Sequence, residues 1–485
     1  MFKSLSRVLF SGILLSSWLA FAEDIKCQAS LFLTADLTAW TEAEERIAFS
    51  RILDNIDHEE TMEGAVLASP SKNDPNYFFH WVRDAALVMK SFLSSDQATR
   101  WYSQFKLEKL IGRYFLFEGH LQDLPAPTGL GEPKFRADGS VFEEDWGRPQ
   151  NDGPALRSLF FIKWANRLLD KGKEKWVREN LFSTMANQKT LIERDLWFVV
   201  QNWVHAGFDL WEEKNGHHFF TRYAQRRALL EGAKLARRLG DEDAFQRLVK
   251  EANSIADSLH HHLSHKDKYI ISNLPVHYFP LNPHALGHGV DVSVVLTLNQ
   301  NYDPDDSLFK MKNSWVLSTV HKIEESFRAE YPINRREDIP GLGIGRYPGD
   351  VFDGAKNEYG NPWFLATLGM AEYYYYLVQE LQIDNRIIAD DVNIDFLKKI
   401  LNRDTIYIGD TVYFDKEELR LLTLKADSYV ARVKFHVDED GSMSEQFDRY
   451  TGYQRSARHL SWSYAAFLSA IKQRRALPAV LFERH

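Results

Sequence analysis

The stretch Ala155–Lys171, ALRSLFFIKWANRLLDK, shows the pattern that decides the fold class. Its apolar side chains recur three and four residues apart, which is the period of an amphipathic α-helix. They form one stripe: Leu156, Leu159, Phe160, Trp164, Leu168 and Leu169. Arg157, Lys163 and Arg167 fall on the opposite face and are expected to point away from the core. Because such a helix needs an apolar partner layer, this stretch predicts a protein built from packed helices.

The same alternation of an amphipathic segment and a long polar loop continues along the chain from Trp40. The helical period predicts helices at 40–57, 84–95, 106–118, 155–171, 187–205, 224–239, 243–265, 309–329, 362–382, 393–402, 417–436 and 456–473. Strands are expected only at 269–271, 405–408 and 412–414. A set of twelve helices is compatible with six inner and six outer members, although periodicity alone does not fix that number. We expect the long loops to carry the function.

The overall composition excludes several classes of protein. With 44% hydrophobic and 26% charged residues among 485, the chain has the composition of a soluble globular protein and not of a disordered or collagen-like one. Its formal net charge is −9, so it lacks the basic surface that binding to nucleic acid requires. No linker rich in Ser, Thr or Pro divides the chain, which favours one large domain.

The first 22 residues have the features of a segment that is removed on export. Lys3 and Arg7 precede an apolar run that ends at Ala20-Phe21-Ala22, which is typical of a secretory signal peptide cut after Ala22. The alternative, a membrane anchor, needs about 20 unbroken apolar residues, and serines interrupt this shorter run. We therefore expect a signal peptide at 1–22 and one secreted or periplasmic domain at 23–485, with no membrane association. Cys27 is the only cysteine, which excludes internal disulfides.

Two acidic loops carry the residues that best suit acid–base chemistry. Glu212 and Glu213 directly follow Trp211, and a carboxyl desolvated by an aromatic wall has the raised pKa that a general acid needs. Glu445 lies in the short polar turn 440–448. Each loop alone is more often a solvated surface. Together, two carboxylates on separate loops are the minimum equipment of a glycosidase.

Two further loops contain groups that suit a polyhydroxylated ligand. The loop 68–84 sets an aromatic run against Arg83 and Asp84, although an N-cap Asp beside a surface Arg gives the same pattern. The loop 129–154 contains Trp146, whose ring suits stacking on a sugar and packing in the core equally. His261 and His265 have a spacing compatible with metal binding, but imidazoles near a helix C-terminus explain them better. We therefore expect no metal site and no organic cofactor.

At these loops the sequence resembles the glucoamylases, the family that also contains bacterial glucodextranases, and it follows the pattern of the fungal-type catalytic domain. The resemblance runs from about Leu37 to Arg474. It rests on ASPSKNDPNYFFHWVRD (68–84), GLGEPKF (129–135), WGRPQNDGPALR (146–157), FDLWEEKNG (208–216), QRRALLEG (225–232), GRYP (345–348), NPWFL (361–365) and GSMSEQFD (441–448). Chance does not produce such blocks in order. The resemblance implies an all-α (α/α)6 barrel with its long functional loops, and a pocket, on one face.

The resemblance also implies roles for individual residues. Glu212 matches the general acid and Glu445 the general base. Gln446 stands beside the base, and Ser456 matches a serine hydrogen-bonded to it. The other matched positions belong to the substrate pocket: Tyr77, Arg83, Asp84, Trp146, Arg148, Trp211, Glu213, Arg346 and Trp363.

These matches imply an exo-acting, inverting hydrolase that acts on α-1,4-linked glucans such as starch, maltodextrins and glycogen. Glu212 would protonate the glycosidic oxygen while Glu445 activates water on the opposite face, with the carboxyls roughly 6.5–9.5 Å apart. The product would be β-glucose. An α-1,6-preferring enzyme of the glucodextranase type and a catalytically silent sugar-binding protein are the alternatives. We expect a monomer whose partner is the glucan.

Three departures from the family pattern bear on this inference. The fungal cysteines are absent, Phe447 replaces a tyrosine after the base, and the segment 349–360 is longer than its fungal counterpart. We expect no starch-binding domain after residue 474, so soluble glucans are favoured over raw starch.

Overall fold

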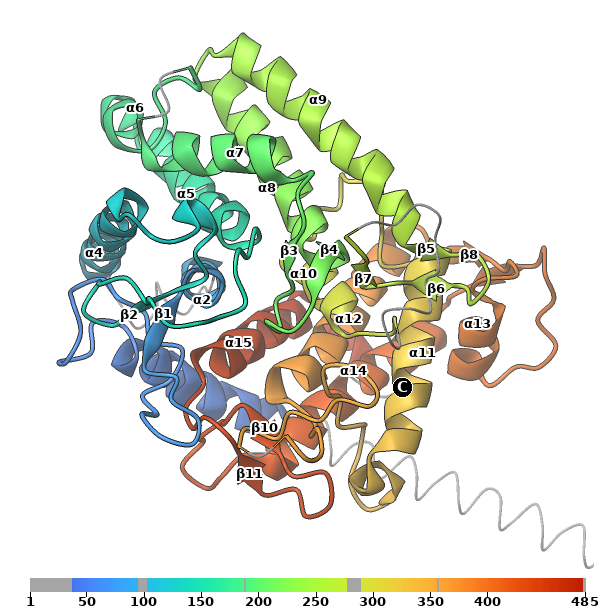
Figure 1. The fold of residues 1–485 in the computed structure, drawn as a ribbon. Coiled ribbons are helices and arrows are strands. Elements are labelled where there is room, and N and C mark those ends of the chain that lie inside the picture. The colour runs from blue at the N-terminus through green and yellow to red at the C-terminus, as the bar shows by residue number, and fades with distance from the viewer. Residues whose placement is uncertain (1–36, 95–102, 187–188, 277–288, 356, 483–485) are drawn as a thin grey trace, which may run out of the picture.

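The computed structural model of the chain describes residues 37–94, 103–186, 189–276, 289–355 and 357–482 (Figure 1). The predicted signal peptide and Cys27 lie outside these residues. Within the described ranges, no helix combines the length and the apolar composition that crossing a bilayer requires.

Six helices form a closed inner ring. They are α2 (Val82–Ser94), α5 (Gly153–Asp170), α8 (Phe219–Arg238), α10 (Ser293–Gln300), α12 (Phe364–Ile383) and α15 (Ser461–Ala476). Each packs against the next one in this order, and α15 packs against α2, which closes the ring. An inner helix touches other elements on nearly all sides, so α12 is buried along almost its whole length.

Six outer helices alternate with the inner ones along the chain. They are the helix at residues 37–54, α4 (Gln104–Asp123), α7 (Leu191–Asn202), α9 (Glu242–Leu259), α11 (Ser314–Glu330) and α14 (Lys416–His436). The outer helix α9 packs on α8, and α14 packs on α12. Figure 1 shows α4, α9 and α11 at the periphery. The predicted (α/α)6 barrel is confirmed, and apolar side chains of both layers join in one core.

Short elements stiffen the loops between these helices. Two more helices, α6 (Glu174–Asn180) and α13 (Ile394–Leu401), lie outside the rings, and 3-10 turns occur at 129–131, 260–262, 332–335 and 479–481. The strands pair antiparallel: β1 (Phe79–Trp81) with β2 (Lys134–Arg136), β3 (Gly207–Phe208) with β4 (Asn215–His218) and β4 with β7 (Asn273–Leu274), β5 (Leu263–Ser264) with β6 (Tyr269–Ile270), β8 (Arg386–Ile388) with β9 (Thr411–Tyr413), and β10 (Gln446–Phe447) with β11 (Gln454–Arg455). The pairings β1–β2 and β4–β7 join loops that are distant in sequence, whereas the others join segments closer in the chain.

The structure corrects several predictions of secondary structure: α6 was not predicted, and among the strands only β6 and β9 overlap predicted ones. Helix α10 is absent from the predicted set because its eight residues are almost all buried and so carry no amphipathic period. The segment 405–408 forms turns instead of a strand, and the exposed Tyr407 and Ile408 find no apolar layer to cover. His261 and His265 do not share a helix, because a 3-10 turn and then β5 follow the end of α9 at Leu259.

Arg157 is a further correction, since its side chain is only 2% exposed and does not face solvent. Its Nη1 donates to Glu118 Oε2 at 2.8 Å, and its Nη2 donates to Asp195 Oδ1 at 2.6 Å. Glu118 lies on α4 and Asp195 on α7, so the two ion pairs tie two outer helices to α5. A buried guanidinium is tolerated here because carboxylates replace its lost hydration.

Candidate active site

The first turns of several inner helices meet at one end of the barrel. Arg83 is the second residue of α2, Trp363 is the N-cap of α12, and Trp462 is the second residue of α15. All three line a cavity of about 490 Å³. Loops form the rest of its wall, so the barrel supplies a rigid floor on which loop residues are placed.

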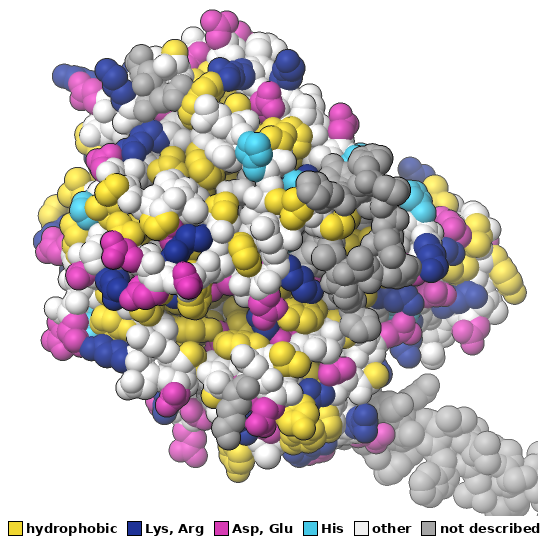
Figure 2. All heavy atoms as spheres, viewed as in Figure 1, with side chains coloured by type: hydrophobic (Ala, Val, Ile, Leu, Met, Phe, Trp, Pro, Cys, Tyr) yellow, Lys and Arg dark blue, Asp and Glu magenta, His cyan; other side chains and the backbone are white. Residues whose placement is uncertain are grey.

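Most of the predicted site residues line this cavity. They are Tyr77, Arg83, Asp84, Trp146, Trp211, Glu212, Glu213, Arg346, Trp363 and Glu445. Figure 2 shows hydrophobic side chains gathered along a hollow on the face in view, in the region where Figure 1 has β1, α15 and β10. The cavity therefore combines apolar ring faces with a few placed charges, a combination typical of small-molecule sites.

Glu212 is held by donors from two other loops. Trp81 Nε1 donates to Glu212 Oε1 at 2.7 Å, and Gln150 Nε2 donates to the same oxygen at 3.0 Å. The φ angle of Glu212 is +67°, a left-handed value that residues other than glycine seldom adopt. A tight turn imposes it, because the Glu212 amide donates to Asp209 O and the Glu213 amide donates to Asp209 Oδ1. The position of this carboxyl is therefore fixed by its backbone and by its donors.

Glu445 is only 1% exposed and sits among hydrogen-bond donors. Gln446 Nε2 donates to Glu445 Oε2 at 3.0 Å, and Ser456 Oγ donates to the same oxygen. Burial raises the pKa of Glu445 to about 7, while the hydroxyls of Ser456 and Tyr77 and the charge of Arg346 oppose the rise. The carboxyl therefore changes its charge near neutral pH.

Arg83, which is buried, and Asp84, which is partly buried, form an ionic pair at the start of α2. Arg83 Nη1 donates to Gln150 Oε1 at 2.7 Å and to Asp152 Oδ2 at 3.2 Å, and its Nε lies 3.3 Å from Asp84 Oδ2. Burial raises the pKa of Asp84 to about 6, and the charge of Arg83 limits the rise. These groups present both donors and acceptors to a ligand at the bottom of the cavity.

Arg346 fixes Glu213 on another part of the wall. Arg346 Nη2 donates to Glu213 Oε1 at 2.7 Å and to Asp350 Oδ1 at 2.6 Å. The guanidinium carbon lies 5.5 Å from the ring centres of both Trp211 and Trp363, within the range of cation–π attraction. A positive charge in a well-defined orientation therefore stands beside Glu213.

Two predicted residues in the loop 129–154 differ in their placement. Trp146 lies on the cavity wall and is 38% exposed, so it does not pack in the core. Arg148 is not among the described residues that line the cavity. Its Nε donates to Glu132 Oε1 at 2.9 Å, and its Nη2 donates to Phe142 O at 3.2 Å. Arg148 therefore braces this loop from behind the wall.

Several lining or supporting residues were not identified from the sequence. Trp81 and Gln150, which donate to Glu212, stand inside the blocks that carry the family resemblance, so the signal was present there. Phe352 belongs to the longer segment 349–360 and lines the cavity. In the same segment Gly354 has φ +85°, and a Cβ built on it would lie 2.4 Å from Ser456 Oγ. The longer segment thus lines the cavity through Phe352 and, through Gly354, lies against Ser456, which donates to Glu445.

The arrangement is suited to acid–base chemistry on an uncharged ligand with many hydroxyls. Two carboxyls, Glu212 and Glu445, come from different loops and face one cavity, and each has its own donors. Aromatic rings and paired charges supply the surfaces that bind and orient a sugar. In the described part of the chain, no group of three or more His, Cys, Asp or Glu side chains is placed to hold a metal ion.

Comparison with known proteins gives a consistent relationship over most of the chain. A glucoamylase of Blastobotrys adeninivorans is 37% identical over 91% of this chain and 73% of its own length. An intracellular sporulation-specific glucoamylase of Saccharomyces cerevisiae is 31% identical over 90% of this chain and 84% of its own length. The solved glucoamylase of Saccharomycopsis fibuligera matches with a TM-score of 0.81 and 30% identity, over 91% of this chain and 96% of that one. Residues 46–472 match the profile of the glycosyl hydrolases family 15, and the chain therefore belongs to that family.

Proposed function

We propose that this chain is an exo-acting, inverting hydrolase that releases β-glucose from the non-reducing ends of α-1,4-linked glucans. The observation that carries the proposal is the pair Glu212 and Glu445, which face one cavity from separate loops. The names of the relatives, glucoamylases, support the choice of substrate class.

In the proposed mechanism Glu212 is the general acid and Glu445 is the general base. Because Trp81 and Gln150 both donate to Oε1 of Glu212, the proton that is delivered is carried on Oε2. This proton passes to the glycosidic oxygen as the bond from that oxygen to the anomeric carbon breaks. A water molecule attacks the anomeric carbon from the opposite face and gives a proton to Glu445. Proton exchange with solvent then restores both carboxyls.

The other wall residues bind and orient the sugar in this proposal. Arg83 and Asp84 bind the terminal glucose. Arg346 and Glu213 bind the sugar of the leaving group, on the other side of the scissile bond. Aromatic walls cover the ring faces: Tyr77, Trp146, Trp211 and Trp363. Gln446 and Ser456 hold the base in position. Arg148 acts through the loop that it braces.

The first test is a time course with maltotetraose, in which proton NMR follows the anomeric form of the product. We expect early β-glucose together with maltotriose. Early α-glucose would contradict inversion, and internal products such as maltose at early times would contradict exo action. Isomaltotetraose run in parallel distinguishes the α-1,6-preferring alternative. Release from neither substrate would favour a silent sugar-binding protein.

We further propose that the chain is exported, is cut after Ala22 and is a monomer of one catalytic domain. The basic and apolar pattern of residues 1–22 supports export. Family membership does not decide this point, because one relative is named intracellular. N-terminal sequencing of the protein recovered from the producing cells would check the cut, and light scattering would check the mass in solution.

A further inference from the structure

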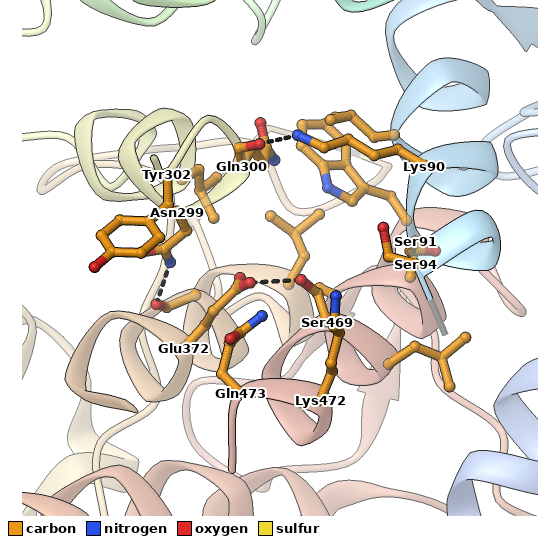
Figure 3. Close-up of a pocket in the computed structure, with 18 of the residues that line it drawn as sticks. Lys90, Ser91, Ser94, Asn299, Gln300, Tyr302, Glu372, Ser469, Lys472 and Gln473 are labelled. Atoms are coloured by element: carbon orange, nitrogen blue, oxygen red, sulfur yellow. Dashed lines mark hydrogen bonds between the residues drawn. The ribbon is translucent and has the colours of Figure 1, made fainter. Parts of the chain in front are cut away.

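A second cavity lies inside the barrel, between the inner helices (Figure 3). Its volume is about 230 Å³, and residues of α2, α5, α10, α12 and α15 line it. Trp462 lines both cavities. On α2, Arg83 in the first turn faces the catalytic pocket, whereas Lys90 and Ser94 in later turns face the second cavity. The two cavities therefore lie one after the other along the length of the inner helices.

Three lysines from three helices converge on the second cavity: Lys90 of α2, Lys163 of α5 and Lys472 of α15. Lys90 Nζ reaches across to the main-chain oxygen of Gln300 (Figure 3). Lys163 Nζ donates to Ser94 Oγ. Glu372 is the one acidic side chain among the described residues of the lining, and it already accepts a hydrogen bond from Ser469. The cavity therefore has an excess of positive charge.

The titration of the lysines agrees with this excess. Burial lowers the pKa of Lys163 to about 7 and that of Lys90 to about 8. The other charged groups that act on these two lysines are Lys472, Arg167, Arg227, Glu231 and Glu372. The charges of Lys90 and Lys472 lower the pKa of Lys163, and the charge of Lys472 lowers that of Lys90, where Glu231 and Glu372 only partly offset the decrease. An anion placed among the lysines would relieve this repulsion.

The α10 side of the cavity offers a hydrogen-bond acceptor that has no partner among the described residues. Asn299 is 3% exposed, and its Nδ2 donates to Gly369 O at 2.7 Å, which fixes the orientation of the amide. Its Oδ1 is buried and accepts no hydrogen bond from any described residue. A buried acceptor left in this state is destabilising, and a hydroxyl group of a ligand would satisfy it.

We propose that this cavity binds the phosphomonoester of a small polyol or sugar. The phosphate lies between the ammonium groups of Lys90, Lys163 and Lys472, and a hydroxyl of the ligand donates to Asn299 Oδ1. Charge-assisted hydrogen bonds from ammonium groups suit both the monoanion and the dianion of a phosphomonoester. The volume of about 230 Å³ lies below the range of roughly 300–1,000 Å³ usual for larger ligands, which excludes a nucleotide. This site is independent of the activity proposed for the catalytic pocket.

Isothermal titration calorimetry on the whole protein at pH 6 tests the proposal, with glycerol 3-phosphate as the probe. We expect one equivalent to bind and free glycerol to give no measurable heat. Inorganic phosphate should bind at least tenfold more weakly, because it has no hydroxyl that reaches Asn299. Glycerol 3-phosphate itself should bind more weakly at pH 9, where Lys163 and Lys90 have lost most of their charge.

Variants locate the site. Lys163→Gln should weaken binding at least tenfold. Lys472→Gln changes an exposed side chain, so it cannot disturb the core, and it should weaken binding at least threefold. Lys175→Gln on α6, where the side chain is 87% exposed, is the matched control and should leave binding unchanged. Absence of binding, equal binding of inorganic phosphate, or full binding by both cavity variants would overturn the proposal.

Discussion

Two buried glutamates, Glu445 and Glu372, lie at successive cavities of the same barrel and titrate alike. Their exposed fractions are 1% and 5%, and burial raises the pKa of each to about 7. Their neighbours differ. Glu445 shares its cavity with a second carboxyl, Glu212, and with aromatic walls, whereas Glu372 shares its cavity with three lysines. A shifted pKa therefore reports burial at both places, and the surrounding groups decide which chemistry is available.

The direction of the inner helices adds to this difference. The N-terminal turns of α2, α12 and α15 end at the catalytic pocket, and their later turns line the lysine cavity. A helix carries a partial positive charge at its N-terminus and a partial negative charge at its C-terminus. The first end therefore favours carboxylates, whereas the lysine cavity is lined at mid-helix on α5 and α12, where the helix ends contribute little, and owes its charge to its lysine side chains. One ring of helices thus supplies two electrostatically opposite sites.

Exchange of each buried glutamate for glutamine is the strongest test of the comparison. Glu445→Gln removes the proposed base and should lower kcat on maltotetraose by about 10³-fold, within the range known for general bases, while maltose still binds. Glu372→Gln should change kcat less than about twofold, since its side chain contacts Ser469 and not the catalytic pocket. Steady-state kinetics with calorimetry would measure both. A similar loss of kcat in the two variants would contradict the distinction.

The contact between the segment 349–360 and Ser456 gives the next prediction. Gly354→Ala would place a Cβ 2.4 Å from Ser456 Oγ, so the serine must move away from Glu445. We expect kcat to fall about tenfold because the base is no longer held in position. Gly240→Ala is the matched control: Gly240 has φ +81° and open space around its Cβ position, so both changes strain the backbone, but only one affects Ser456. Equal kcat values in the two variants would contradict this role of the segment.

Ser456 also predicts a pH effect of smaller size. The hydroxyl of Ser456 donates to the Glu445 carboxylate, favours its charged form and so lowers its pKa. Ser456→Ala removes this effect, and the pKa of Glu445 should rise further above about 7. A base acts in its charged form, so the acidic limb of kcat/KM should move to higher pH, by about one pH unit or less. An unchanged pH profile would show that Glu445 is not the base or that the hydrogen bond is not made.

The sequence predicted the parts of the fold and site that are encoded locally. Amphipathic periods located most helices, and the loop blocks contained the residues that line the catalytic pocket. Helix α10 escaped prediction because a short helix buried on every side has no polar face to mark its period. Arg157 was wrongly predicted to face away from the core, because Glu118 and Asp195, which neutralise its charge, lie on other helices.

Non-local placement explains the remaining gaps. The position of Arg148 behind the cavity wall depends on Glu132 and on the carbonyl of Phe142, which no spacing rule connects to it. The lysine cavity is a stronger case. Lys90, Lys163 and Lys472 come from three separate helices, and each alone has the pattern of a solvated residue on an amphipathic helix. Only closure of the ring brings them together.

The smallest predicted effect concerns stability at the lysine cavity. Burial lowers the pKa of folded Lys163 from 10.5 to about 7. The folded state therefore loses stability relative to the unfolded chain as the pH falls below 10.5, and the loss is complete once the pH is below about 7. Lys163→Met removes this loss and should raise the Tm by about 2 °C at pH 6, with a smaller gain at pH 9. Differential scanning calorimetry at the two pH values measures it, and Lys175→Met on the exposed face of α6 is the control. A constant difference in Tm at both pH values would mean that packing, and not charge, separates the variant from the parent. The predicted trend would mean that the lysine cavity destabilises the fold through its charges, as expected of a site arranged for an anion.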